Sequence, residues 1–170
     1  MACGVIGQAE MTLGSLARCE RLVRQCSDNL RLQYDSDPSS EQAGRVLSVS
    51  LSDLGDFYVS RGQSGDAERA LTQFEESHQI AKQLFEANRN SAEAARDLSV
   101  SYDRLGDFYV SRGQAGDAER ALTQFEESLT IRKQLFEANR NSAEAARDLS
   151  VSLNKLGDFY VSREIGRAHV

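Results

Sequence analysis

The sequence predicts an all-α protein of the solenoid type, in which antiparallel helix pairs stack in a row. Residues 55–105 and 106–156 are consecutive copies of one segment, identical at 44 of 51 positions, and a third copy begins at Gly157. Apolar residues recur within each copy at helical spacing rather than in the alternation typical of strands. A repeat this regular indicates an array of one structural unit. The length of 170 residues therefore counts stacked units rather than one closed domain.

The segment before the repeats is interpreted as a degenerate copy of their second half. We expect a tail over residues 1–11, a degenerate repeat over residues 12–54 and a first helix over 12–34. A shift of two periods places two cysteines on small positions of the later copies: Cys19 on Ala70 and Ala121, and Cys26 on Ser77 and Ser128. Both cysteines are therefore predicted to be buried in the core as small hydrophobes.

Each repeat is predicted to begin with a leading helix whose apolar side faces the core. In the central repeat this helix covers 90–111, with Asn90 as its N-cap and Gly113 as the residue of positive φ that ends it. One side of the helix carries Leu98, Ser101, Tyr102, Leu105, Phe108 and Tyr109. Gly106 lies mid-helix, where glycine costs up to about 1 kcal/mol relative to alanine, so we expect another helix backbone to approach closely there. The equivalent leading helices are predicted over 39–60 and 141–163.

A second helix follows each leading helix after a turn. In the central repeat it covers 117–138 and is predicted to be capped by Asp117, and the equivalent helix covers 66–87. Its inner face carries Ala118, Ala121, Leu122, Phe125, Ser128, Leu129 and Phe136. The array thus opens on a second helix and closes on a leading helix, which leaves both ends unpaired.

These residues resemble the signature of the tetratricopeptide repeat family. The family's Leu-Gly, Tyr, Ala, Phe and small-residue positions are occupied by Leu105, Gly106, Tyr109, Ala121, Phe125 and Ser128, and one period earlier by Leu54, Gly55, Tyr58, Ala70, Phe74 and Ser77. The resemblance covers roughly residues 12–163 and implies a right-handed superhelix whose leading helices line a concave groove. The chain departs from the family in its period of 51 residues, against about 34, and in lacking proline after the repeated second helices.

Composition narrows the compartment and the class of partner. A net charge of −6 with interleaved acidic and basic residues argues against nucleic acid. No signal peptide pattern is seen at the start, and no apolar run approaches the roughly 18 residues that a membrane span needs. Cys3, Cys19 and Cys26 form neither a disulfide framework nor a CxxC metal motif. We therefore expect a cytoplasmic protein with no nucleic-acid or membrane partner.

The sequence contains no recognisable catalytic constellation. It lacks a phosphate-binding GxxxxGK[ST] loop, a GxSxG elbow and an HExxH helix. His78 lies at the edge of an apolar stripe and is interpreted as structural or solvated. The carboxylate pairs Glu75-Glu76 and Glu126-Glu127 occupy adjacent helical positions, which is typical of a solvated face. We therefore expect a non-enzymatic protein with no cofactor, no metal and no small-molecule substrate.

The candidate binding surface is the side of each leading helix opposite the core. The predicted site residues are Val49, Ser52, Asp56 and Val59 in the first helix, Val100, Asp103, Asp107, Val110 and Ser111 in the second, and Val151, Asn154, Asp158 and Val161 in the third. Parallel rows of valine and aspartate favour a groove for a peptide that carries Lys or Arg between apolar residues. Singly exposed valines are also ordinary on protein surfaces.

Three roles remain open from the sequence. The first is a scaffold that binds a peptide or protein segment. The second is a structural protein whose unpaired terminal helices dock end to end into a filament. The third is a docking or sensor arm of a longer signalling protein or enzyme.

The C-terminal residues leave the repeat. Residues 157–163 begin a third copy, whereas 164–170 match no part of the repeat and resemble the translation of a common sequencing adapter. We therefore expect the natural protein to continue beyond Arg163 and His169 to carry no function.

Overall fold

The computed structural model describes the backbone of residues 3–168 and the side chains of residues 17–164. The described backbone forms α1 (Cys3–Ser36), α2 (Glu41–Arg61), α3 (Asp66–Ala87), α4 (Ala92–Arg112), α5 (Asp117–Ala138) and α6 (Ala143–Ala168). Helices α2 to α5 begin and end within two residues of the predicted bounds. The other two are longer than predicted, because α1 begins at Cys3 inside the expected tail and α6 continues to Ala168. His169 and the Cys3 side chain lie outside the described residues.

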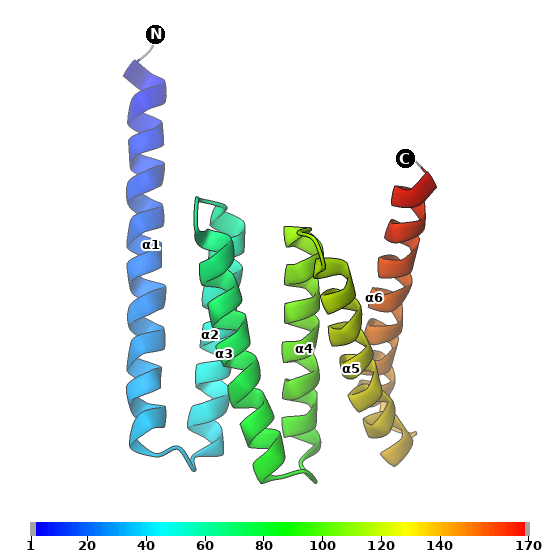
Figure 1. Ribbon diagram of the computed structural model, residues 1–170. Coiled ribbons are helices and arrows are strands. Elements are labelled where there is room, and N and C mark those ends of the chain that lie inside the picture. The colour runs from blue at the N-terminus through cyan, green and yellow to red at the C-terminus, as the bar shows by residue number, and fades with distance from the viewer. Residues whose placement is uncertain (1–2, 169–170) are drawn as a thin grey trace.

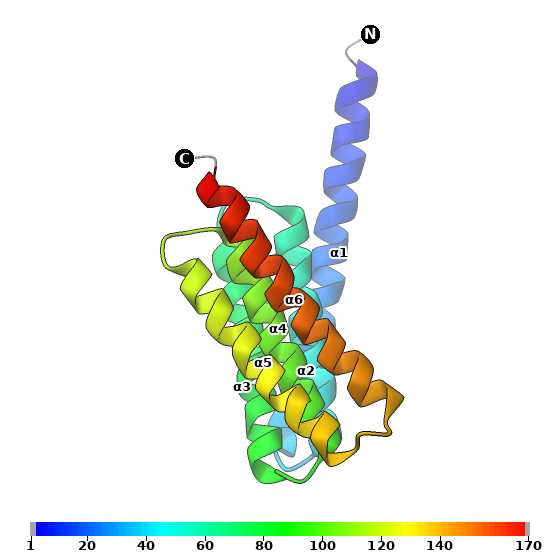
Figure 2. The same ribbon diagram turned by 90° about the vertical axis from the view of Figure 1, so that its right-hand side faces the viewer.

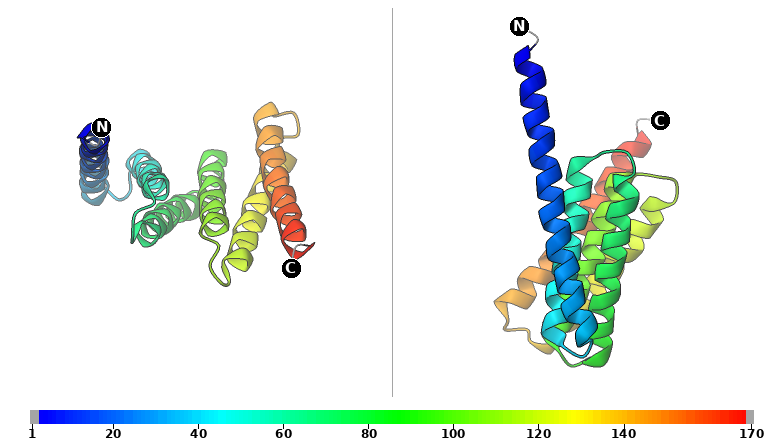
Figure 3. Two further views of the ribbon diagram at one scale, coloured as in Figure 1. Left: turned by 90° about the horizontal axis from the view of Figure 1, so that it is seen from above. Right: turned by 90° about the vertical axis from the view of Figure 1, so that its left-hand side faces the viewer.

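The helices stack in one row, each packing mainly on the next along the chain (Figure 1). Viewed from above they follow a zigzag from α1 to α6 (Figure 3), with α2, α4 and α6 in one layer and α3 and α5 in the other. The N-terminal end of α1 projects beyond its neighbours, and α6 crosses the row at a tilt (Figure 2). This architecture confirms the predicted all-α solenoid. Within the described residues, no helix combines the length and apolarity that crossing a bilayer requires.

The core repeats the same residues from one helix pair to the next. One buried cluster joins Leu54, Tyr58, Ala70, Phe74, Leu105, Phe108, Tyr109, Ala121, Phe125, Leu156 and Phe159. Leu105 is 4% exposed, whereas Asp107 is exposed on the opposite side of α4. The predicted orientation of the leading helices, with the leucine and aromatic side inward, is therefore confirmed.

The sequence predicts that a helix backbone approaches Gly106, but the structure places an aromatic ring there instead. A Cβ atom at Gly106 would lie 2.4 Å from Cε1 of Phe125 on the paired helix. One repeat earlier, a Cβ at Gly55 would lie 2.7 Å from Cε1 of Phe74. The glycine lets the phenylalanine ring rest directly on the leading helix.

Two predicted helix caps are wrong by one residue. The N-cap of α4 is Ser91 rather than Asn90, and its Oγ accepts a hydrogen bond from the Ala94 amide at 3.1 Å. The N-cap of α5 is Gly116, and Asp117 is the first helical residue. Gly113 has φ of 62° and ends α4 as predicted.

Cys19 and Cys26 are exposed, contrary to the prediction that they are core residues. The equivalent Ala121 and Ser128 are fully buried because α5 turns this side toward its leading helix, α4. Within the described residues, no leading helix covers that side of α1. The repeat alignment alone does not predict burial, because these positions also need a helix partner that α1 lacks within the described residues.

Contacts between neighbouring pairs support that alignment. Ser27 on α1 shares a hydrogen bond of 2.9 Å with Ser50 on α2. One period later, His78 Nδ1 and Ser101 Oγ are also 2.9 Å apart. The degenerate first copy therefore packs on the next leading helix in the same register as the full repeat.

Candidate functional site

The predicted valines form an exposed strip along the layer of leading helices. The valine strip consists of Val49 and Val59 on α2, Val100 and Val110 on α4, and Val151 and Val161 on α6, all of them exposed. Ser111, Asn154 and Asp158 are exposed beside it. The structure thus brings together the apolar part of the predicted surface.

The strip borders hollows where successive leading helices meet. Val49 and Val100 line a pocket of about 100 Å³ between α2 and α4. Val59 lines a second hollow between the same helices near their C-terminal ends, and Val110 lines a third between α4 and α6. These valines therefore lie at the edges of concave spaces rather than on flat surface.

The predicted row of free aspartates is instead largely a ladder of ion pairs between repeats. Arg104 of α4 donates to Asp56 of α2, and one period later Lys155 Nζ lies 2.7 and 2.6 Å from the two carboxylate oxygens of Asp107. No ion pair involves Asp158 among the described residues. Asp56 and Asp107 therefore hold neighbouring leading helices together and carry less free charge than expected.

A second ladder joins the N-terminal halves of the same helices. Arg45 Nε on α2 donates to Asp97 on α4 at 2.6 Å, and Arg96 Nε on α4 donates to Asp148 on α6 at 2.8 Å. Both arginines also pair with a glutamate of the neighbouring helix. Two rows of charge pairs thus hold the spacing between the leading helices.

Asp103 is buried, which corrects its assignment to the exposed groove. It is 6% exposed, its Oδ2 forms an ion pair with Arg132 Nη2 at 2.8 Å, and its Oδ1 has no hydrogen-bond partner. Burial raises the pKa of this carboxyl, an effect that the nearby Arg132 guanidinium opposes. The helical angle of Asp103 was predicted correctly, but Arg132 covers that side of α4. Ser52, its equivalent on α2, is half-buried and bonds to Ser77.

The Arg132 side chain extends from α5 into the space between α4 and α6. Its Nε donates to Ser99 Oγ at 3.1 Å, and its Nη1 donates to Ser152 Oγ at 3.0 Å and to the Asp148 carbonyl at 3.3 Å. The side chain is 5% exposed. One guanidinium therefore links two leading helices through serine, carbonyl and carboxylate oxygens.

An arginine and an aspartate five residues apart lock the turn of each helix pair. Arg112 donates from Nε and Nη2 to the two carboxylate oxygens of Asp117, at 2.8 and 2.6 Å, and the Gln114 amide donates to the same carboxylate. These bonds hold the pKa of Asp117 at about 2. Arg61 and Asp66 make the same pair one period earlier. The recurrence of Arg and Asp at this spacing is the sequence signal that could have revealed these turn ion pairs.

His78, which the sequence predicts to be structural or solvated, contacts residues of α4. It is half-buried, bonds to Ser101 and packs on Tyr102 with the ring centroids 4.5 Å apart. Burial lowers its pKa. Of the carboxylates predicted to be solvated, Glu76 is half-buried and pairs with Arg31 of α1.

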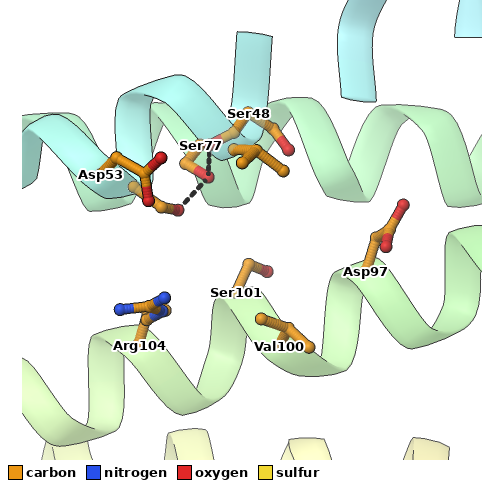
Figure 4. Close-up of a pocket in the computed structure, with 9 residues that line it drawn as sticks. Ser48, Asp53, Ser77, Asp97, Val100, Ser101 and Arg104 are labelled. Carbon is orange, nitrogen blue, oxygen red and sulfur yellow. Dashed lines mark hydrogen bonds between the residues drawn. The ribbon is translucent and has the colours of Figure 1, made fainter. Parts of the chain in front are cut away.

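Sequence reasoning missed most of the polar residues around the pocket between α2 and α4. Its polar lining consists of Ser48, Ser52, Asp53, Ser77, Asp97, Ser101 and Arg104. Ser101 points across the pocket toward Ser77, with Arg104 at one end and Asp97 at the other (Figure 4). These residues come from three helices, so no local motif in the sequence joins them.

Fold and surface together define a helical repeat protein with an apolar strip and polar pockets between its repeats. No profile of a known protein family matches the chain. Over 135 residues it is 28% identical to Protein NCA1 of Arabidopsis thaliana, a match that takes in 79% of this chain. The chain spans 31% of the length of that relative.

Proposed function

We propose that this protein is a non-enzymatic scaffold of tetratricopeptide type that binds a protein or peptide segment along the valine strip. The observation that carries the proposal is the position of the exposed valines at the edges of the hollows between leading helices. Apolar side chains beside concave spaces offer a ligand both burial and shape. A segment lying across α2, α4 and α6 would meet the same arrangement in successive repeats.

The favoured ligand carries basic residues between apolar ones. The net charge of −6 attracts cationic segments. Asp53 and Asp158 are exposed acidic residues near the strip and make no ion pair in the described part of the chain. Because exposed charges are screened beyond roughly 10 Å at 0.1 M salt, binding is expected to weaken as salt rises.

The test is selection of binders from a displayed library of random peptides, followed by titration of the tightest peptide against variants. Val100→Ser with Val110→Ser is expected to weaken binding about tenfold or more, because two apolar contacts are lost. Leu32→Ser is the matched control, since Leu32 is an exposed apolar residue of α1 outside the strip. Equal loss with the control, or no loss with the double variant, contradicts the proposal.

End-to-end assembly is a second candidate function, favoured by the exposed apolar residues on one side of α6. Tyr160 is 50% exposed, whereas its equivalents Tyr58 and Tyr109 are 2% and 8% exposed. Leu153 on the same helix is also exposed, and a Cβ at Gly157 would meet nothing within 4 Å. Docking of α1 from a second copy would cover this side. Light scattering measures the molar mass of the protein in solution. A monomeric mass at about 100 μM, well above the μM affinities of weak specific contacts, would exclude assembly.

A role as an arm of a longer protein is compatible with both peptide binding and end-to-end assembly, and the greater length of the Arabidopsis relative makes it worth testing.

A reducing, cytoplasmic compartment is also part of the proposal. It rests on the odd number of cysteines and on the free, exposed thiols of Cys19 and Cys26.

A further inference from the structure

The pocket between α2 and α4 is the repeat equivalent of the space that Arg132 fills between α4 and α6. Each of the four residues that Arg132 contacts has a counterpart 51 positions earlier that lines the pocket. The pairs are Ser99 and Ser48, Asp103 and Ser52, Asp148 and Asp97, and Ser152 and Ser101. The two sites are therefore built from equivalent positions of the repeat.

The earlier site is open because the residue equivalent to Arg132 is Ala81. Ala81 is buried and has no side chain beyond Cβ to reach across the junction. The remaining space of about 100 Å³ is several times the roughly 10 to 15 Å³ that one water requires. Val49 and Val100, both exposed, line this space. A side chain from a bound segment can therefore enter this pocket from the side of the valine strip. Arg132 enters the equivalent site from the other side, from α5.

The serine oxygens of the open pocket that correspond to those contacted by Arg132 retain the capacity to accept a hydrogen bond. Ser48 donates its hydroxyl hydrogen to the Arg45 carbonyl at 3.3 Å, as Ser99 does to the carbonyl of Arg96. Ser101 donates its own to the Leu98 carbonyl at 2.7 Å, and its oxygen lies 2.9 Å from His78 Nδ1, so it accepts a hydrogen bond from that nitrogen. A hydroxyl oxygen has two lone pairs, so Ser48 keeps both and Ser101 keeps one that can accept a further hydrogen bond. A planar guanidinium with several N–H groups matches acceptors spread over two helices better than an ammonium does.

We propose that this pocket binds the guanidinium of an arginine side chain from the partner segment, with the aliphatic stem of that arginine lying between Val49 and Val100. This inference rests on the proposed function and deepens it, because it names the residue that the groove recognises. Arg132 is the observed example of such a side chain in the equivalent site of the same protein.

The charges around the pocket allow a cation to enter. Arg104 lines it, but its guanidinium donates to Asp56, just as Lys155 binds Asp107 beside the buried Arg132. Ser52 replaces the carboxylate of Asp103, so the compensating charge in the open pocket comes from Asp53. Asp53 is exposed and makes no ion pair within the described residues. Because that charge is partly solvated, the open pocket is expected to hold arginine reversibly.

The probe is N-acetyl-arginine methylamide, followed by NMR shifts of the Val49 and Val100 methyl groups, with the neutral citrulline analogue as the matched ligand control. The arginine probe is expected to shift both methyl groups, and the citrulline probe is expected to bind at least about tenfold more weakly because charge-assisted hydrogen bonds are lost. Ser52→Asp, which copies Asp103, is expected to tighten arginine binding by a similar factor.

The decisive variant is Ser52→Asp with Ala81→Arg, which copies both residues of the closed site into the open one. The variant should fold, since the chain already uses this pair one repeat later, and a thermal unfolding scan verifies it. Arginine binding at Val49 and Val100 should then be lost. Unchanged binding in the folded double variant, or equal binding of citrulline to the native protein, overturns the inference.

The same double variant separates this inference from the proposed function. If the selected peptide still needs the valine strip but binds the double variant as tightly as the native protein, the pocket assignment is wrong and the scaffold stands. If the arginine probe binds in the pocket while no peptide depends on Val100 and Val110, the pocket stands and the scaffold is wrong.

Discussion

At the scale of single residues, near-identical repeats provide internal controls for each other. Gly55, Gly106 and Gly157 occupy one position of the repeat, yet their surroundings differ. The first two lie under phenylalanine rings, whereas the third faces open space. Substitution of this glycine by alanine should therefore have opposite effects on stability at Gly106 and Gly157.

Gly106→Ala is expected to destabilise the protein by about 1 to 3 kcal/mol, the usual cost of overpacking. The new Cβ would lie 2.4 Å from a ring that is itself buried, so neither group can move freely. Gly157→Ala lacks this clash and should gain up to about 1 kcal/mol of helix propensity. Urea unfolding of both variants measures the difference. A gain at both positions would show that Phe125 does not press on α4.

Arg132 and Ala81 show how one side chain changes the use of a junction. Both are at the same position of the repeat, and both are buried. Arginine closes the junction between α4 and α6 with hydrogen bonds to both helices, while alanine leaves the preceding junction hollow. The few positions at which the repeats differ therefore include the ones that separate a structural contact from a candidate binding pocket.

At the scale of the helix pair, the turn is held by a buried ion pair rather than by the glycines alone. The carboxylates of Asp66 and Asp117 are almost fully buried and accept bonds from both an arginine and a turn amide. Each arginine also lies over an aromatic ring of its own helix, with Arg112 5.2 Å from the centroid of Phe108. The turn ion pair thus ties the end of the leading helix to the start of the second helix.

This pair predicts an acid-dependent loss of stability. The pKa of both aspartates falls from 3.8 to about 2 on folding because of their arginine partners. A depressed pKa stabilises the fold at pH above about 4, and the contribution is lost as pH falls toward 2. Urea unfolding at a series of pH values should show this fall in the native protein and a shallower one in Asp66→Asn with Asp117→Asn.

The comparison between the native protein and the variant is essential because Asp103 acts in the opposite direction. Its pKa is raised by burial, so protonation of this group favours the folded state as pH falls. Asp103 is present in both proteins and cancels in the difference. Identical pH profiles would mean that the turn ion pairs contribute no net stability.

At the scale of the whole molecule, stability is expected to depend on position along the row. Each helix packs mainly on the next one along the chain, so the free energy of unfolding is approximately a sum over repeats and their interfaces. Leu105 lies between two neighbouring pairs, whereas Leu156 lies on the terminal helix α6. The two leucines occupy the same position of the repeat.

Leu105→Ala is expected to cost about 2 to 5 kcal/mol, the range for large-to-small changes in a core. Leu156→Ala should cost less, because fewer packed helices surround it and α6 can separate without unfolding the rest. Chemical denaturation followed by circular dichroism measures both. Equal losses would contradict a linear stack and indicate a single cooperative core.

Much of the fold could be predicted because helical periodicity and repetition are local properties of the chain. The spacing of Leu105, Tyr109 and Phe125 was sufficient to orient α4 and α5, and the exposed strip followed from the opposite side of the same helices. The cap at Ser91 was missed by one residue because two neighbouring residues, Asn90 and Ser91, can both serve as caps.

The errors at the site arose where a side chain's surroundings come from another helix. Angle alone placed Asp103 in the groove, but α5 supplies the arginine that buries it. Alignment alone placed Cys19 and Cys26 in the core, but α1 has no leading helix to cover them in the described chain. In the same way, Asp56 and Asp107 were correctly assigned to the outer side of their helices, and their cations come from the following repeat.

The sequence by itself determined the helices, their pairing and the side of each that faces inward, because these depend on periodicity within a few turns. Tertiary structure alone decided which polar residues are free, which are neutralised and which junction is hollow. Those properties depend on contacts between residues 16 to 52 positions apart in the chain, and charge and burial are set by neighbours that local sequence does not specify.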